Sequence, residues 1–173
     1  PLAFAPGSTY SYSNTNFFLL GMVIESATGN PYHEEVRTRL LEPLGLDDTY
    51  LDGAELLPGG FVRGYEHIST GSYVDMTDAF DPSLTWAAGG LISTVEDLDD
   101  WGRALFTGDA LSPAMRTAML KREPLPGGGV SPYGLCIRIQ VLPGGLGLFY
   151  SHGGRLQGFN TMFGYLADHD VMS

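Results

Sequence analysis

The sequence is poor in cysteine, in lysine and in positive charge. Its one cysteine is Cys136, so no disulfide forms within the chain, and its one lysine is Lys121. There are 9 basic residues against 20 acidic ones, which gives a formal net charge of −11. A surface of this sign repels phosphate groups, which argues against nucleic-acid binding. No run of roughly eighteen apolar residues occurs, so the sequence predicts no transmembrane helix.

The composition is that of a folded chain with many turns. Its 173 residues suffice for about one domain. Hydrophobic residues make up 43% and charged residues 17%, which supports a buried core and argues against a disordered tail. The 24 glycines and 11 prolines argue against an all-helical bundle. The chain begins at Pro1, without a methionine or a basic-then-apolar signal sequence, so we expect a mature or shortened chain.

Four segments carry helix signals, either apolar residues at helical spacing or residues that start or stop a helix. The predicted helices run over residues 16–27, from 31 to just before 43, from a cap at 93–96 to 108, and from 112 to about 121. The third begins with a capping box, in which Glu96 returns to the Ser93 backbone. Residues 47–90 have no clean period and predict irregular structure with short strands.

Beyond residue 132 the apolar period becomes alternating. Residues 133–141 predict a half-buried strand, with Cys136 semi-buried on it. Residues 146–152 and 160–166 predict two further strands, and the last four residues predict no closing element. Helices first and antiparallel strands last indicate an α+β fold.

Tyr12-Ser13-Asn14 is the first candidate for chemistry, in a loop before the first predicted helix. A phenol titrates near pH 10, so Tyr12 needs a nearby cation to move a proton at neutral pH. The amide of Asn14 can both donate to and accept from a substrate. The alternative is a helix-start turn with Ser13 or Asn14 as its cap.

His152-Gly153-Gly154 and the stretch from Trp86 to Thr94 are the second and third candidates. Glycines after the histidine let a ligand lie against the backbone. The alternatives are a turn with an exposed histidine and a tight turn that leads into the capped helix. The four histidines fit no metal-ligand spacing, so the sequence predicts no metal site.

These segments belong to an ordered set of motifs. The set runs Pro6-Gly7-Ser8, Tyr12-Ser13-Asn14, Gly21-Met22-Val23-Ile24-Glu25, Thr28-Gly29, Pro43-Leu44-Gly45-Leu46, Ala88-Gly89-Gly90-Leu91-Ile92-Ser93-Thr94, Tyr133-Gly134-Leu135 and His152-Gly153-Gly154. It resembles the serine beta-lactamase and DD-peptidase superfamily, in particular class C beta-lactamases, D-Ala-D-Ala carboxypeptidases and related esterases. The resemblance implies a beta-lactamase/transpeptidase-like fold and no metal or organic cofactor.

The resemblance also implies a mechanism. A serine in a Ser-x-x-Lys motif attacks a carbonyl and forms an acyl-enzyme. Tyr12 and the lysine of that motif would move the proton, and Asn14 would contact the substrate amide. His152 would take the place of the lysine in the family's Lys-Thr-Gly motif and act beside Tyr12.

Five further residues would bind substrate in this picture. The strand edge at Gly153 and Gly154 would receive the substrate backbone, and the Arg155 N–H would be an oxyanion donor. Arg138 would bind a free carboxylate through its planar fork, the alternative being a solvated strand arginine. Trp86 would line the cleft or, alternatively, serve as a core aromatic.

The chain departs from this pattern in one respect, since it contains no Ser-x-x-Lys. The residue three positions before Lys121 is Ala118. We therefore expect residues 1–173 to be part of one domain truncated at both ends, with helices and loops over about 1–131 and antiparallel strands over about 132–173. A missing N-terminal portion would carry the nucleophile. The alternatives are a short protein that has lost catalysis, or a substitute nucleophile among Ser11, Ser13 and Ser151.

The predicted activity is that of an enzyme which hydrolyses an amide or ester, D-Ala-D-Ala carboxypeptidase-like or a D-amino-acid peptidase. A beta-lactamase or carboxylesterase is the alternative, and a non-catalytic binding protein is another. The resemblance implies a small-molecule or peptide substrate and a secreted or periplasmic location.

Overall fold

The computed structural model describes residues 2–69 and 71–173 and divides into two compact units. The first unit comprises Pro1–Ser13, Gly102–His152 and Met162–Ser173. The second comprises Asn14–Trp101 and Gly153–Thr161. No helix in the described part of the chain is both long and apolar enough to cross a membrane.

Helix α1 (Asn14–Thr28) opens the second unit and confirms the first predicted helix, starting two residues before the expected position. Its end is set by Gly29, which adopts a φ of 78°. This left-handed conformation suits a glycine and terminates the helix, because the Gly29 N–H donates to the Glu25 carbonyl at 2.8 Å. The predicted stop is therefore confirmed.

The next helical segment extends beyond the predicted end. It consists of α2 (Tyr32–Val36), a π-helical turn η1 (Arg37–Leu41) and α3 (Glu42–Leu44). The expectation that it ends before Pro43 is wrong, because α3 continues η1 without a break and includes the proline. Gly45, at a φ of 68°, ends the segment instead.

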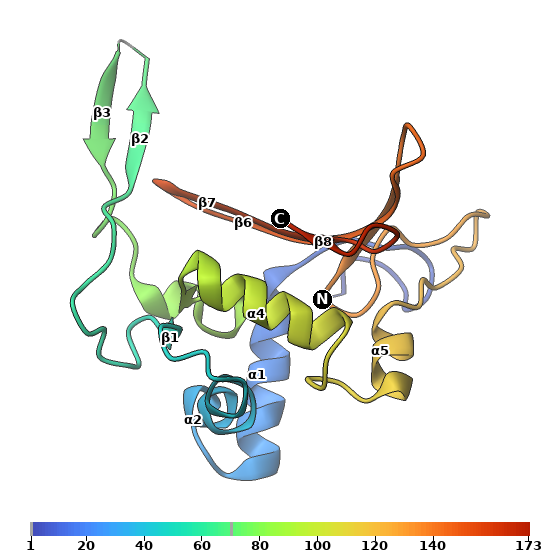
Figure 1. The fold of residues 1–173 in the computed structure, drawn as a ribbon, viewed down its shortest axis with the longest axis horizontal. Helices are drawn as coiled ribbons and strands as arrows, with labels where there is room; N and C mark the ends of the chain where they lie inside the picture. The colour runs from blue at the N-terminus through green and yellow to red at the C-terminus, as the bar shows by residue number, and fades with distance from the viewer. Residues whose placement is uncertain (1, 70) are drawn as a thin grey trace. The chain divides into compact units, whose positions relative to one another are not determined.

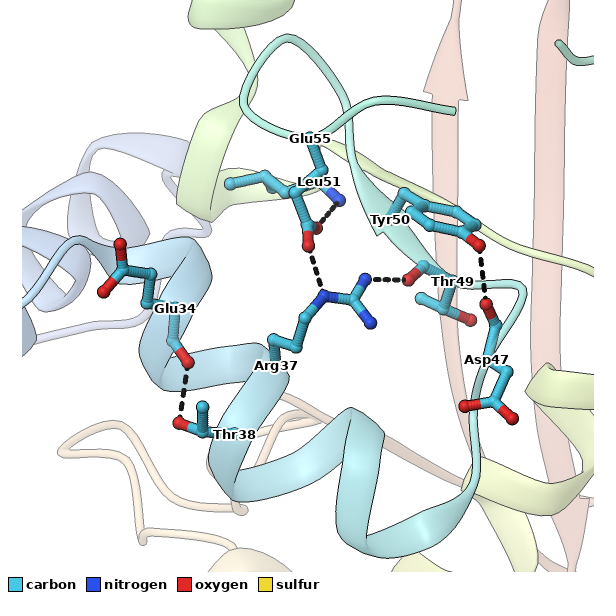
Figure 2. Close-up of polar contacts among 8 residues, drawn as sticks. All are labelled: Glu34, Arg37, Thr38, Asp47, Thr49, Tyr50, Leu51 and Glu55. Atoms are coloured by element: carbon cyan, nitrogen blue, oxygen red, sulfur yellow. Dashed lines mark hydrogen bonds and ion pairs between the residues drawn. The ribbon is translucent and has the colours of Figure 1, made fainter. Parts of the chain in front are cut away.

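A polar cluster joins this helical segment to the strand that follows it (Figure 2). The Arg37 guanidinium donates to Glu55 through Nε and to the Thr49 carbonyl through Nη2, the latter at 2.7 Å. It also lies 5.2 Å from the ring centroid of Tyr50. Glu55 in turn accepts from the Leu51 N–H at 2.6 Å. One arginine of the helical segment thus contacts Thr49 and Tyr50 at the start of β1 and Glu55 in the loop after it.

The expected irregular region from 47 to 90 is observed. Its short elements are β1 (Tyr50–Leu51), β2 (Tyr65–Ile68), β3 (Ser72–Asp75), and the 3-10 turns η2 (Pro82–Leu84) and η3 (Trp86–Ala88). β1 pairs with β4 (Leu91–Ile92), and β2 and β3 form an antiparallel hairpin (Figure 1).

Helix α4 (Val95–Phe106) begins one residue later than the predicted capping box implies. Its cap is Thr94, whose Oγ1 accepts from the Asp97 N–H at 3.2 Å, whereas the Ser93 hydroxyl is 2.8 Å from that of Thr49. The buried Asp97 carboxylate accepts from the Thr49 hydroxyl at 2.6 Å. This tertiary bond draws the start of the helix toward β1. Helix α5 (Pro113–Met119) starts at its predicted Ser112 cap and ends earlier than predicted.

Four strands form one sheet in the order β5-β6-β7-β8. They are β5 (Arg138–Leu142), β6 (Gly147–Leu156), β7 (Phe159–Leu166) and β8 (Val171–Met172). β5 runs antiparallel to β6, and β8 antiparallel to β7. In the first unit, Phe106 stacks on Tyr150, Phe163 and Tyr165 at centroid distances of 5.7, 5.9 and 5.0 Å, which anchors the helix to the sheet. Helices with antiparallel strands confirm the α+β class.

Two strand predictions need correction. The first half of the predicted strand 133–141 is a chain reversal, in which the Gly134 N–H donates to the Ile137 carbonyl at 2.8 Å. Cys136, at a φ of 61°, makes this reversal and is exposed, not semi-buried. The last residues do form an element, because β8 pairs with the end of β7.

Candidate active site

The two predicted catalytic residues lie together in the first unit. The rings of Tyr12 and His152 have centroids 6.0 Å apart. A third ring, that of Tyr133, lies 5.8 Å from each of them. The Tyr133 hydroxyl is 2.7 Å from His152 Nε2, which is hydrogen-bond distance. These three side chains, Tyr12, Tyr133 and His152, are called the Tyr–His cluster below.

Strand pairing explains how the cluster forms. Tyr133 forms an isolated antiparallel bridge with Arg138, the first residue of β5. Arg138 is opposite Ser151 of β6, and His152 follows Ser151. Two steps across the sheet therefore bring Tyr133 and His152 close, although they are 19 residues apart. Tyr12 is added by the segment that precedes α1, and Tyr10 of the same segment stacks on Tyr133 at 5.8 Å.

Both phenols of the cluster hold their protons tightly. Burial raises the pKa of Tyr12, with smaller contributions from Cys136 and Tyr10. Burial is also the main cause that raises the pKa of Tyr133, followed by Tyr12, while Arg138 acts in the opposite direction. Neither phenol is a base at neutral pH in these surroundings. Proton transfer through Tyr12 therefore requires a cation beside it.

Arg138 lies on β5, and Gly153 and Gly154 lie on the neighbouring strand β6. Arg138 is exposed at the start of β5, and its bridge with Tyr133 places its backbone beside the cluster. Pairing between β5 and β6 ends at Ser151, so Gly153, Gly154 and Arg155 extend beyond the paired part of β5. In the second unit, the Arg155 guanidinium is 3.7 Å from the Glu66 carboxylate.

Asn14 and Trp86 belong to the second unit. Asn14 is the first residue of α1. Trp86 is half-buried, with its ring 5.9 Å from Phe18 and 5.3 Å from Tyr32. A Cβ at Gly21 would lie 2.8 Å from the indole, so this glycine lets α1 approach the ring. These contacts are those of a packing aromatic, and a substrate contact of Trp86 stays a prediction.

Comparison with known proteins identifies the family. The model of the beta-lactamase family matches residues 1–172. The chain belongs to the beta-lactamase family. Penicillin-binding protein 4* of Bacillus subtilis is 27% identical over 96% of this chain and 39% of its own length. A D-aminopeptidase of Brucella anthropi is 28% identical over 95% of the chain and 31% of its own length.

Solved structures agree with this family assignment. A D-stereospecific amidohydrolase from Streptomyces sp. superposes with a TM-score of 0.80 at 32% identity. That match covers 94% of this chain and 48% of the amidohydrolase chain. The chain thus spans about half of this structure and less than half of the curated relatives described above. The beta-lactamase/transpeptidase-like fold and the serine hydrolase family are confirmed.

The sequence predicts the Tyr–His cluster only in part. Tyr12 and His152 were predicted as neighbours, and they are. Tyr133 belongs to the Tyr133-Gly134-Leu135 motif, but the sequence predicts no role for it. Its bridge to Arg138, which carries it to the cluster, depends on the tertiary structure.

Proposed function

We propose that the protein containing this chain is a serine hydrolase that cleaves an amide or ester through an acyl-serine intermediate. The most favoured substrates are peptides or amides of D-amino acids, as for a D-Ala-D-Ala carboxypeptidase or a D-aminopeptidase. The observation that carries the proposal is the 6.0 Å separation of Tyr12 and His152 within a chain of the beta-lactamase family.

In the proposed reaction a serine hydroxyl from a Ser-x-x-Lys segment attacks the substrate carbonyl carbon. Its proton passes to the lysine and Tyr12, and then to the departing amine or alcohol as the C–N or C–O bond breaks. Water then cleaves the acyl-serine ester and regenerates the hydroxyl. Burial raises the pKa of Tyr12, and the positive charge of a nearby lysine would act in the opposite direction and favour proton transfer. His152 would contribute beside Tyr12.

Substrate binding is assigned to six residues. Asn14 would hold the substrate amide, and Trp86 would border the cleft. Gly153 and Gly154 would offer the strand edge that β5 leaves unpaired, and the Arg155 N–H would donate to the oxyanion. Arg138 would bind a free substrate carboxylate, a role supported by its exposure and by its charge near Tyr133.

The apolar surface of α1 supports the proposal that further polypeptide completes the domain. Leu19, Leu20, Met22 and Val23 are each more than half exposed. A helix that is apolar on several faces is typical of a protein interior. We propose that residues 1–173 form part of one hydrolase domain, with mainly helices and loops over about 1–131 and antiparallel strands over about 132–173. An N-terminal portion would cover α1 and carry the nucleophile.

The test uses the full-length protein in which this chain occurs. It should be labelled by a fluorophosphonate probe on the serine of a Ser-x-x-Lys motif and should release D-alanine from a D-Ala-D-Ala peptide or ammonia from a D-amino-acid amide. Faster turnover of a penicillin or of simple esters would indicate a beta-lactamase or carboxylesterase. Absence of both labelling and hydrolysis would overturn the proposal in favour of a binding protein. We further propose a secreted or periplasmic location, tested by cell fractionation.

A further inference from the structure

We propose that Tyr133 is a positioning residue for His152, because its hydroxyl holds the imidazole through Nε2 and selects the tautomer with the proton on Nδ1. This inference deepens the proposed function and rests on it. It assigns a role to a residue outside the predicted catalytic pair of Tyr12 and His152.

The direction of the hydrogen bond between Tyr133 and His152 is inferred from the chemistry of the two groups. The two atoms lie 2.7 Å apart, and the rings meet edge to face at 69°. A phenol hydroxyl is a strong donor and a weak acceptor, whereas the unprotonated nitrogen of an imidazole is a strong acceptor. The favoured arrangement is therefore Tyr133 O–H donating to His152 Nε2. Burial raises the pKa of Tyr133, which keeps its hydroxyl protonated and available as the donor.

The surroundings hold Tyr133 firmly enough to position another residue. Its N–H donates to the Ser131 hydroxyl at 3.1 Å, and that hydroxyl donates to the Tyr133 carbonyl at 2.8 Å. Ser131 is buried. The Tyr10 ring stacks on the Tyr133 ring at an interplanar angle of 29°. Because Tyr133 also bridges to Arg138, its backbone is tied to the strand next to that of His152. The hydroxyl is thus set in place before substrate binds.

A fixed tautomer has a consequence for Tyr12. With Nε2 as the acceptor, the neutral imidazole carries its proton on Nδ1, which becomes its N–H donor. The His152 imidazole then places the same N–H and acceptor nitrogen beside Tyr12 in every turnover. Loss of the Tyr133 hydroxyl would let the imidazole rotate, change tautomer or take up a proton on Nε2.

The experiment compares Tyr133→Phe with Tyr10→Phe in the full-length protein. Both variants remove one phenol hydroxyl from the same aromatic stack and keep the ring, but only Tyr133 is bonded to His152. Nitrogen NMR of labelled histidine, with the His152 signals assigned from His152→Gln, reports the tautomer directly. Steady-state kinetics on a D-amino-acid amide report kcat and KM separately, and thermal melting checks the fold.

We expect the wild type and Tyr10→Phe to carry the His152 proton on Nδ1. In Tyr133→Phe that proton should move toward Nε2, with kcat lowered roughly 10-fold, KM within about twofold, and the acid limb of the rate profile shifted to higher pH, in line with other residues that orient a functional histidine. An unchanged tautomer in Tyr133→Phe, or a proton on Nε2 in the wild type, would overturn the positioning role whatever the activity. A changed tautomer with unchanged kcat would overturn its part in catalysis. A wild type without hydrolysis would instead refute the proposed function, while the NMR result still reports on the hydrogen bond.

Discussion

Tyr12 and His152 are 140 positions apart in the sequence, yet their ring centroids are 6.0 Å apart. Both belong to the same compact unit, together with the buried Ser131 and the strand that precedes β6. A phenol and an imidazole at this distance can influence each other's protonation. The predictions below test whether that proximity serves hydrolysis.

Replacement of Tyr12 by phenylalanine in the full-length protein should remove the proposed proton path and leave the ring in place. We expect kcat on a D-amino-acid amide to fall by about 10²–10⁴-fold, the usual contribution of a general acid–base group. Tyr73→Phe is the control, since Tyr73 lies on the β2–β3 hairpin and is 69% exposed. Equal rates for the wild type and Tyr12→Phe would remove Tyr12 from the mechanism.

Arg138 distinguishes substrates with and without a free carboxylate. We expect Arg138→Ala to lower kcat/KM for peptides that end in a carboxylate by about 10-fold or more, because a charge-assisted hydrogen bond contributes about 1.5–3 kcal/mol. Simple esters should react at nearly the wild-type rate. The variant Arg138→Lys should lose less rate than Arg138→Ala but should not reach the wild-type rate, since an ammonium lacks the planar fork. If both substrate types lose rate equally, Arg138 does not read the carboxylate.

The Arg37–Glu55 pair predicts a stability effect that depends on pH. Burial raises the pKa of Glu55, but Arg37, the Leu51 N–H and the charge of His33 outweigh it, so the net shift is downward. A carboxylate with a lowered folded-state pKa stabilises the fold above its unfolded pKa, and that stability is lost as the pH falls through the folded pKa. Arg37→Ala should cost about 2 kcal/mol in urea unfolding at neutral pH, and less in acid.

Arg63→Ala is the matched control for that measurement. Arg63 also pairs with a carboxylate, that of Asp75, but its side chain is 59% exposed, against 24% for Arg37. An exposed ion pair contributes about 0–1 kcal/mol, so we expect a much smaller loss. Similar losses for the two variants would show that burial of the Arg37 cluster does not strengthen it.

The 173-residue chain by itself should not react with a penicillin or a fluorophosphonate probe. Its only lysine is Lys121, and Ala118 stands three positions before it, where a Ser-x-x-Lys motif would need the serine. The full-length protein serves as the positive control, and mass spectrometry would locate any label. Labelling of Ser13 or Ser151 in the short chain would contradict the proposed source of the nucleophile.

Local signals predicted the elements that depend on local chemistry. The end of α1 followed from Gly29, which alone tolerates the left-handed φ there without strain. The start of α5 followed from the Ser112 hydroxyl and Pro113. The failed predictions involve distant partners. The 133–141 strand is broken because the Leu135 N–H donates to the Met119 carbonyl at the end of α5, which no alternating pattern can reveal.

The sequence by itself determined the α+β class, the resemblance to the family, the absence of Ser-x-x-Lys and the pairing of Tyr12 with His152 as candidates. The class follows from periodicity and element order, and the pairing of Tyr12 with His152 is implied by the family resemblance that the ordered motifs carry. All of these are properties of the linear chain. Only the tertiary structure decided that Tyr133 bonds to His152 and that Arg37 joins η1 to β1. Both depend on strand register and side-chain packing between segments that are distant in the chain, and such contacts leave no local pattern in the sequence.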